Sequence, residues 1–317
     1  MRVFWDNARP MVDWGYLGAR RFVEPFFEDT IGRCVRHPAD LLFRHQTPLE
    51  KLGEIAAAQP GVAPTGFIFH MSRCGSTLLC QMLAASVKNI VISEASPIDT
   101  ILRAHFRQTN ISDEERVQWL RWMVAALGWR RHPAEKHLFI KFDCWHTLSL
   151  PLIERAFPGV PWVFLYRDPL EVLASHQNHC GPQMVPGLLD PSLFGWDAPT
   201  VRAMTLEEYG ARALAKICEA PVTQAQRGMG KLVNYRQLPG EVWPALLQHW
   251  GVEFSPEESV EMMKAARLNA KNPALPFEED SQAKRQGASE ATRALARQWL
   301  EEIYVKLEGR RMELELR

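Results

Sequence analysis

The chain has 317 residues, of which 46% are hydrophobic and 23% charged, as is ordinary for a soluble globular protein. Lysine plus arginine and aspartate plus glutamate both number 37, so the net charge is zero and the composition gives no reason to expect nucleic acid as a partner. No apolar run approaches the roughly 20 residues that span a bilayer, and the N-terminus has no signal-peptide core. We therefore expect a cytoplasmic protein with no membrane partner.

The first 62 residues are rich in aromatic side chains and broken by prolines, and one helix is predicted there, near residues 48–58. So many rings, if exposed, would favour aggregation. We therefore predict that residues 1–62 form an N-terminal extension that packs on the main domain or on the second subunit of a homodimer. The α/β domain itself is predicted at residues 63–317.

Short apolar segments alternate with helical patterns through the rest of the chain. Strands are predicted at residues 66–70, 89–93, 137–142, 160–166 and 231–235. Helices are indicated from residue 78, at 112–128, 148–157, 205–226 and 239–250, from 255, and at 289–307. This alternation predicts right-handed crossovers and a three-layer α/β sandwich with a central parallel sheet. Residues 179–200 and 269–288 show no period, and we expect the first segment to be either an ordered lid over the acceptor site or mobile.

A polar turn joins the strand at 66–70 to the helix that begins near Leu78. Its backbone N–H groups, with the hydroxyls of Ser76 and Thr77 beside them, lie at the positive end of a helix and suit a phosphate. Gly75 lets the backbone approach an anion closely, and Arg73 supplies a planar fork of donors. The lysine of nucleotide-triphosphatase loops is missing, which argues against ATP.

A second strand-to-helix junction carries a similar set of polar groups. Arg167 follows the strand at 160–166, and Ser175 lies eight residues later, about two turns into the next helix. A guanidinium and a hydroxyl that converge there would bind one more phosphate. The alternative interpretation is a surface arginine before a helix that begins with Asp168-Pro169.

These two stretches resemble one family. Arg73-Cys74-Gly75-Ser76-Thr77-Leu78-Leu79 is similar to the 5′-phosphosulfate loop of sulfotransferases that use 3′-phosphoadenylyl sulfate (PAPS), especially the bacterial and tyrosylprotein-type branches. Arg167 to Ser175 resembles their 3′-phosphate site. The resemblance covers residues 66–175 and becomes loose from residue 231, and Lys284-Arg285-Gln286-Gly287 only faintly matches the closing segment of cytosolic members. It implies a P-loop-like nucleotide-binding fold, PAPS as donor, 3′-phosphoadenosine 5′-phosphate (PAP) as product, and these donor contacts: Arg73, Cys74, Gly75, Ser76, Thr77, Leu78, Arg167 and Ser175.

Sulfuryl transfer needs a positioned donor, charge stabilisation on the leaving oxygen and a base for the acceptor proton. Glu94, which ends the strand at 89–93, is our predicted base and resembles the glutamate found there in tyrosylprotein-type and bacterial members. Lys141 is predicted to approach the bridging oxygen. His176 and His146 are alternative bases, and a purely structural role is the competing interpretation for each of these residues.

Several points stay open from the sequence. The six cysteines show no zinc-binding spacing, and no metal is predicted. Cys74, beside Arg73, is expected either to have a lowered pKa or simply to replace a serine. A kinase-like phosphotransferase that uses ATP and Mg²⁺, and a non-catalytic nucleotide-binding relative, are the alternative functions. The acceptor, whether a small metabolite, carbohydrate, lipid or peptide, is not determined, because acceptor pockets lie on variable loops.

Overall fold

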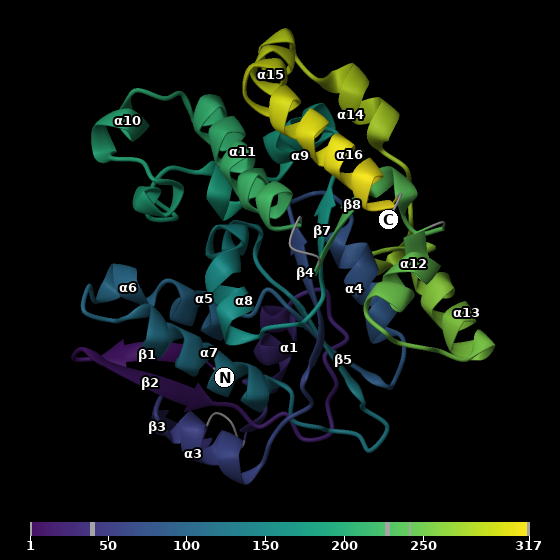
Figure 1. Ribbon diagram of the computed structural model, residues 1–317. Coiled ribbons are helices and arrows are strands. Elements are labelled where there is room, and N and C mark those ends of the chain that lie inside the picture. The colour runs from purple at the N-terminus through teal and green to yellow at the C-terminus, as the bar shows by residue number, and fades with distance from the viewer. Residues whose placement is uncertain (1, 39–41, 226–228, 241, 316–317) are drawn as a thin grey trace.

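The computed structural model describes residues 2–38, 42–225, 229–240 and 242–315. A five-stranded sheet forms its centre, with the strand order β5-β6-β4-β7-β8 and parallel pairing throughout (Figure 1). The strands are β4 (Pro64–His70), β5 (Asn89–Ser93), β6 (His137–Lys141), β7 (Trp162–Tyr166) and β8 (Gly230–Asn234). All five predicted strands are confirmed, within two residues at each end.

The strands have few polar residues because the sheet is covered on both faces. Every residue of β5 and β7 is buried. Figure 1 shows one group of helices on one side of the sheet, namely α4 (Ser76–Ala84), α12 (Val242–His249) and α13 (Pro256–Ala265), and a second group on the other, namely α5 (Ser96–Leu102), α7 (Asp113–Leu127) and α8 (Leu150–Ala156). The predicted layered α/β architecture is therefore confirmed.

Five further helices gather beyond the carboxyl ends of the strands. They are α9 (Pro169–Asn178), α11 (Leu206–Gln224), α14 (Ser281–Gly287), α15 (Glu290–Leu295) and α16 (Glu301–Glu315), with a π-helical turn at Ala296–Leu300 between the last two. The short helices α6 (Ala104–Arg107) and α10 (Ala198–Arg202) lie in connections. Among the described residues, no helix has the length and apolar character needed to cross a membrane.

The N-terminal region has more regular structure than we predicted. It contains α1 (Phe27–Cys34), the expected helix α3 (Lys51–Ala58) and an antiparallel sheet of β1 (Arg2–Asp6), β2 (Arg9–Trp14) and β3 (His45–Pro48). Trp5 lies 6.3 Å from Trp119 of α7, measured between ring centroids, and Phe22 and Phe27 are buried in the central core. These three aromatic residues thus pack on the main domain, whereas Phe43 is exposed, and the boundary at residue 62 stays a prediction.

The two segments without a predicted period differ in structure. Residues 269–288 were expected to be irregular, and this was wrong, because they form most of a hairpin of β9 (Leu268–Asn269) and β10 (Asn272–Pro276), followed by α14. Residues 179–200 contain two short 3₁₀ helices, Pro182–Met184 and Pro191–Phe194, and the start of α10, and Phe194 and Trp196 are buried against Tyr209 of α11. Long-range packing therefore orders this segment, and its role as a lid stays a prediction.

Candidate active site

A cavity of about 620 Å³ opens at the carboxyl ends of β4, β5, β6 and β7. In open parallel sheets this edge is where ligands bind. Most of the predicted site residues line the cavity, namely Arg73, Cys74, Gly75, Ser76, Thr77, Leu78, Glu94, Arg167 and His176. The other two, Lys141 and Ser175, are buried and bond to Glu94 and Arg73 of its wall. The fold therefore brings all the predicted residues together.

The loop before α4 has an unusual backbone. Ser72, Arg73 and Gly75 have φ values of +79°, +53° and +85°, and Glu94 at the end of β5 has +53°. Non-glycine residues in this region are uncommon and concentrate at functional sites. Gly75 is required by packing too, since a Cβ there would lie 2.8 Å from the ring of Tyr235. The loop is thus held in one shape, with its helix N-terminus facing the cavity.

The Cys74 side chain behaves differently from our first expectation. Its thiol is buried and donates to the carbonyl oxygen of Leu165 in β7 at 3.1 Å. Burial raises the pKa of Cys74 to about 12. The expected lowering of this pKa was therefore wrong, because the low-dielectric surroundings outweigh the nearby positive charges.

Glu94 lies in a buried cluster with one lysine and one histidine. Its Oε1 is 2.8 Å from Nζ of Lys141 and 3.3 Å from Nε2 of His70. Burial alone would raise the pKa of Glu94, but Lys141 and His70 lower it well below its usual value. Burial opposes the charge on Lys141, whereas the pairing with Glu94 raises the pKa of Lys141 above its usual value. Lys141 also donates to Oγ1 of Thr77 at 3.3 Å, so its ammonium group lies between the glutamate and the phosphate-binding loop.

The two predicted arginines are neighbours. Nη1 of Arg167 lies 3.5 Å from the carbonyl oxygen of Arg73, at the limit of a hydrogen bond. Nε of Arg73 donates to Oγ of Ser175 at 2.7 Å, so Ser175 bonds to Arg73 and not to Arg167, its predicted companion. Burial lowers the pKa of Arg73; the nearby Asp280 carboxylate opposes this effect, and the charge of Arg167 adds to it. An anion in the cavity would relieve that repulsion.

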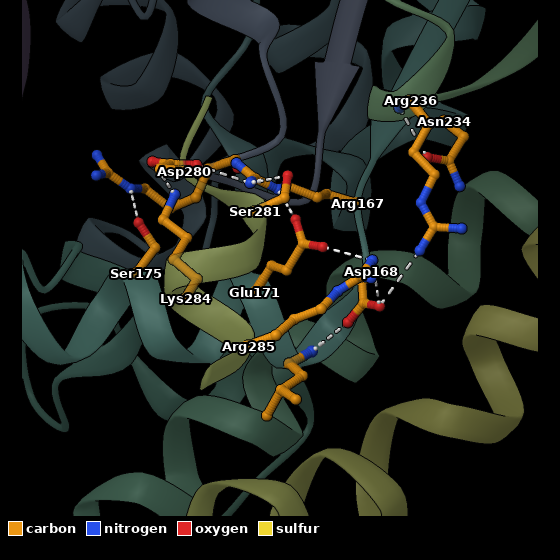
Figure 2. A network of polar contacts seen from close by, with 12 residues as sticks. Arg167, Asp168, Glu171, Ser175, Asn234, Arg236, Asp280, Ser281, Lys284 and Arg285 are labelled. Atoms are coloured by element: carbon orange, nitrogen blue, oxygen red, sulfur yellow. Dashed lines mark hydrogen bonds and ion pairs between the residues drawn. The ribbon is translucent and has the colours of Figure 1, made fainter. Parts of the chain in front are cut away.

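Arg167 already has anionic partners within the protein (Figure 2). Its Nε donates to Oε2 of Glu171 at 2.5 Å, and its Nη2 donates to Oδ1 of Asp280 at 2.8 Å and to Oγ of Ser281 at 3.0 Å. The ring of Tyr235 lies 4.1 Å below the guanidinium carbon. The Arg167 side chain is therefore fixed in position.

The two histidines proposed as alternative bases are both engaged. Nδ1 of His176 accepts from Gly181 N at 3.3 Å, and burial, with Arg73 nearby, lowers the pKa of His176 to about 4. His146 is buried, with Nδ1 accepting from Asp143 N at 3.2 Å and Nε2 2.9 Å from Oδ1 of Asp99. His176 is therefore neutral and weakly basic at neutral pH, and both ring nitrogens of His146 already have partners, so neither side chain is well placed to act as general base.

The structure adds cavity residues that the sequence analysis did not assign to the site. Phe26 comes from the N-terminal region, and Lys271, Asp280 and Lys284 come from the hairpin and α14. Asp143, which follows β6, also lines the cavity, and burial raises its pKa to about 7. The sequence could have indicated Asp143, because it directly follows a predicted strand, whereas nothing in the sequence indicated Phe26.

The possible metal-ligand atoms of Asp99, Asp143 and His146 lie within 4.8 Å of one another, but the bonds described above already use both nitrogens of His146.

The fold and this site define a class of α/β protein with a cavity at the carboxyl edge of a parallel sheet, lined by cations suited to an anionic ligand. The model of the sulfotransferase family matches residues 64–186, which carry β4 to β7 and both arginines. The protein is thus a transferase whose central segment is of the sulfotransferase family, and the family and enzyme class predicted from the sequence are confirmed. No curated protein sequence matches the chain.

Several solved structures resemble the chain at low sequence identity. Sulfotransferase STF9 from Mycobacterium avium has 11% identity and a TM-score of 0.45, covering 79% of this chain and 81% of its own. A sulfotransferase from Alicyclobacillus acidocaldarius has 14% identity and a TM-score of 0.46, covering 79% and 96%. A retinol dehydratase solved in complex with retinol and PAP has 13% identity and a TM-score of 0.40, covering 82% and 89%.

Proposed function

We propose that the protein transfers a sulfuryl group from PAPS to a hydroxyl or amine acceptor by in-line displacement, without a metal ion. The observation that carries this proposal is the shared cavity of Arg73 and Arg167, whose side chains reach it from the ends of neighbouring strands. One adenosine with phosphates at both ends would bind to both arginines. The loop amides, Arg73, Ser76 and Thr77 would bind the 5′-phosphosulfate, and Arg167 would bind the 3′-phosphate, close to Ser175.

The proposed roles of Glu94 and Lys141 follow from their ion pair. Glu94 would accept the acceptor proton as the acceptor oxygen bonds to sulfur and the bond from sulfur to the phosphate oxygen breaks. The electron pair of that bond goes to the leaving phosphate, which Arg73 and Lys141 would stabilise. As Lys141 turns from Glu94 to the leaving oxygen, the carboxylate loses its main counter-ion and becomes a stronger base. Glu94 would thus become more basic as negative charge develops on the leaving phosphate.

His176 would position the site and not act as base, because its pKa of about 4 leaves it neutral and weakly basic at pH 7. Its bond to Gly181 ties α9 to the segment at 179–200. Residues 179–183 of that segment line the cavity together with Phe26 and Trp145, and the acceptor would enter beside them. Small molecules, carbohydrates, lipids and peptides all remain candidate acceptors.

Thermal unfolding with two nucleotides tests the proposed donor. PAP should stabilise the protein, by about 2.7 kcal/mol at 100 times its Kd, whereas ATP with Mg²⁺ should not. Stabilisation by ATP with Mg²⁺ alone would instead favour a phosphotransferase. Transfer of ³⁵S from labelled PAPS to a panel of alcohols, phenols, sugars and amines would then identify the acceptor class.

A further inference from the structure

Arg167 is held by two carboxylates of different kinds. Glu171 is four residues away in α9 and 2% exposed, so it is part of the fixed scaffold. Asp280 is 113 residues away in sequence, and its side chain is 50% exposed. It stands at the N-terminus of α14, after an exposed stretch at residues 272–280. Of the two acids, Asp280 is therefore the one that a ligand can displace.

Asp280 makes contacts that a phosphate would also make. Its Oδ1 accepts from Nη2 of Arg167 at 2.8 Å, and its Oδ2 is 2.6 Å from Nζ of Lys284, as Figure 2 shows. Burial would raise the pKa of Asp280, but its bonds to Lys284 and Arg167 lower it, so the group is an anion at neutral pH. The single carboxylate of Asp280 is thus bonded to two cations, Arg167 and Lys284, that line the cavity.

The remaining charges of the cavity also favour an added anion. Lys271 lines the same cavity, and burial, with Arg73 nearby, lowers its pKa to about 8. Burial likewise lowers the pKa of Lys284; the bond to Asp280 opposes this, and Arg167 and Arg73 add to the lowering. A doubly charged phosphate would satisfy these cations better than one carboxylate. It would also be repelled by Asp280 if that carboxylate stayed in place.

We infer that Asp280 is a built-in competitor that sets the affinity for the donor, because its carboxylate holds Arg167 and Lys284 until a phosphate displaces it. This inference rests on the proposed function, since it needs the 3′-phosphate at Arg167. Displacement requires only that the exposed Asp280 side chain turns away. The helix α14 can stay, because Arg285 anchors it separately, with Nη2 at 2.6 Å from Oε1 of Glu171 and 3.3 Å from Oδ2 of Asp168.

Calorimetric titration of the full chain with PAP tests the inference. Asp280→Asn keeps the size of the side chain and removes its charge, and Glu279→Gln, one residue earlier, removes the same charge as a matched control. We expect Asp280→Asn to bind PAP about tenfold more tightly than the wild type, and Glu279→Gln to change Kd by less than about twofold. Adenosine 5′-phosphate, which lacks the 3′-phosphate, should show no gain with Asp280→Asn.

The outcomes separate this inference from the proposed donor. If the wild type binds PAP and Asp280→Asn binds it equally or more weakly, the inference is wrong and the donor assignment stands. If wild type and both variants fold, as thermal unfolding will show, and none binds PAP, both are wrong. A gain of equal size with adenosine 5′-phosphate would also overturn the inference, because the competition would not be at the 3′-phosphate.

Discussion

The two arginines of the cavity differ in how their charges are compensated. Arg73 bonds to the neutral hydroxyl of Ser175, and burial lowers its pKa, whereas Arg167 is bonded to two carboxylates, and Asp280 and Glu171 raise its pKa against the effect of burial. The same residue type is therefore used in two ways within one cavity. Arg73 is a positive charge ready for a ligand, and Arg167 must exchange one partner for it. We expect sulfuryl transfer to take place on the side of Arg73, and the affinity for the donor to be controlled on the side of Arg167.

The largest effect should come from the side of Arg73. Glu94→Gln should lower kcat about 10²- to 10⁴-fold, because the variant has no carboxylate to take the acceptor proton. The affinity for PAP should change little. Steady-state transfer from PAPS to an identified acceptor, with PAP titration of the same sample, measures both quantities. Glu278→Gln, which changes a carboxylate that also lines the cavity, is the control, and equal losses in the two variants would contradict the assignment.

Alanine substitution of each arginine should separate their structural roles in the ligand-free protein. Arg167→Ala removes charge-assisted bonds to buried Glu171, so the free energy of unfolding should fall by about 1.5 to 3 kcal/mol. Arg73→Ala removes one bond to a hydroxyl, and the lost attraction to Asp280 is offset by the lost repulsion with Arg167, so the loss should be about 1 kcal/mol or less. Urea denaturation measures both. Similar losses would mean that the two charges are compensated alike.

The smallest effect should be a pH dependence of donor binding. The pKa of Lys271 is lowered to about 8, so its ammonium group is present at pH 7 and is lost as the pH rises through 8. The affinity for PAP should therefore fall between pH 7 and 9, by about three- to fivefold, since a partly exposed charge pair contributes at most about 1 kcal/mol. Lys271→Gln should bind PAP more weakly at pH 7 and lose this step. A wild-type affinity that stays level to pH 9 would argue against a contact between Lys271 and the donor.

The parts of the site that were predicted correctly lie on local patterns. The turn after β4 could be read because a strand, a glycine and hydroxyls follow one another within a dozen residues, and Glu94 because it ends a recognisable strand. Parallel strands end at the same edge of their sheet, so residues that follow different strands can be predicted to lie near one another without knowledge of the tertiary structure. The eight-residue spacing of Arg167 and Ser175 predicted their nearness to the cavity, but not that Ser175 would bond to Arg73.

The missed residues depend on contacts between distant segments. Asp280 and Lys284 were unassigned, because nothing in their neighbourhood indicates that α14 lies over α9. Phe26 reaches the cavity from a region without recognisable chemistry. The predicted lowering of the Cys74 pKa was wrong for the same reason. The neighbour of Cys74 in sequence is a cation, but in space its thiol is buried and bonded to a carbonyl oxygen of β7.

The sequence by itself determined the parallel α/β architecture, the phosphate-binding turn and the residue types that end each strand, because hydrophobic period and turn chemistry are properties of short segments. Only the tertiary structure decided the partners of each charged side chain, and with them the direction of each pKa shift. Those partners come from distant segments; Lys88 and Glu258, for example, are 170 residues apart. Burial and Coulomb interactions depend on distances in space, which local sequence patterns do not record.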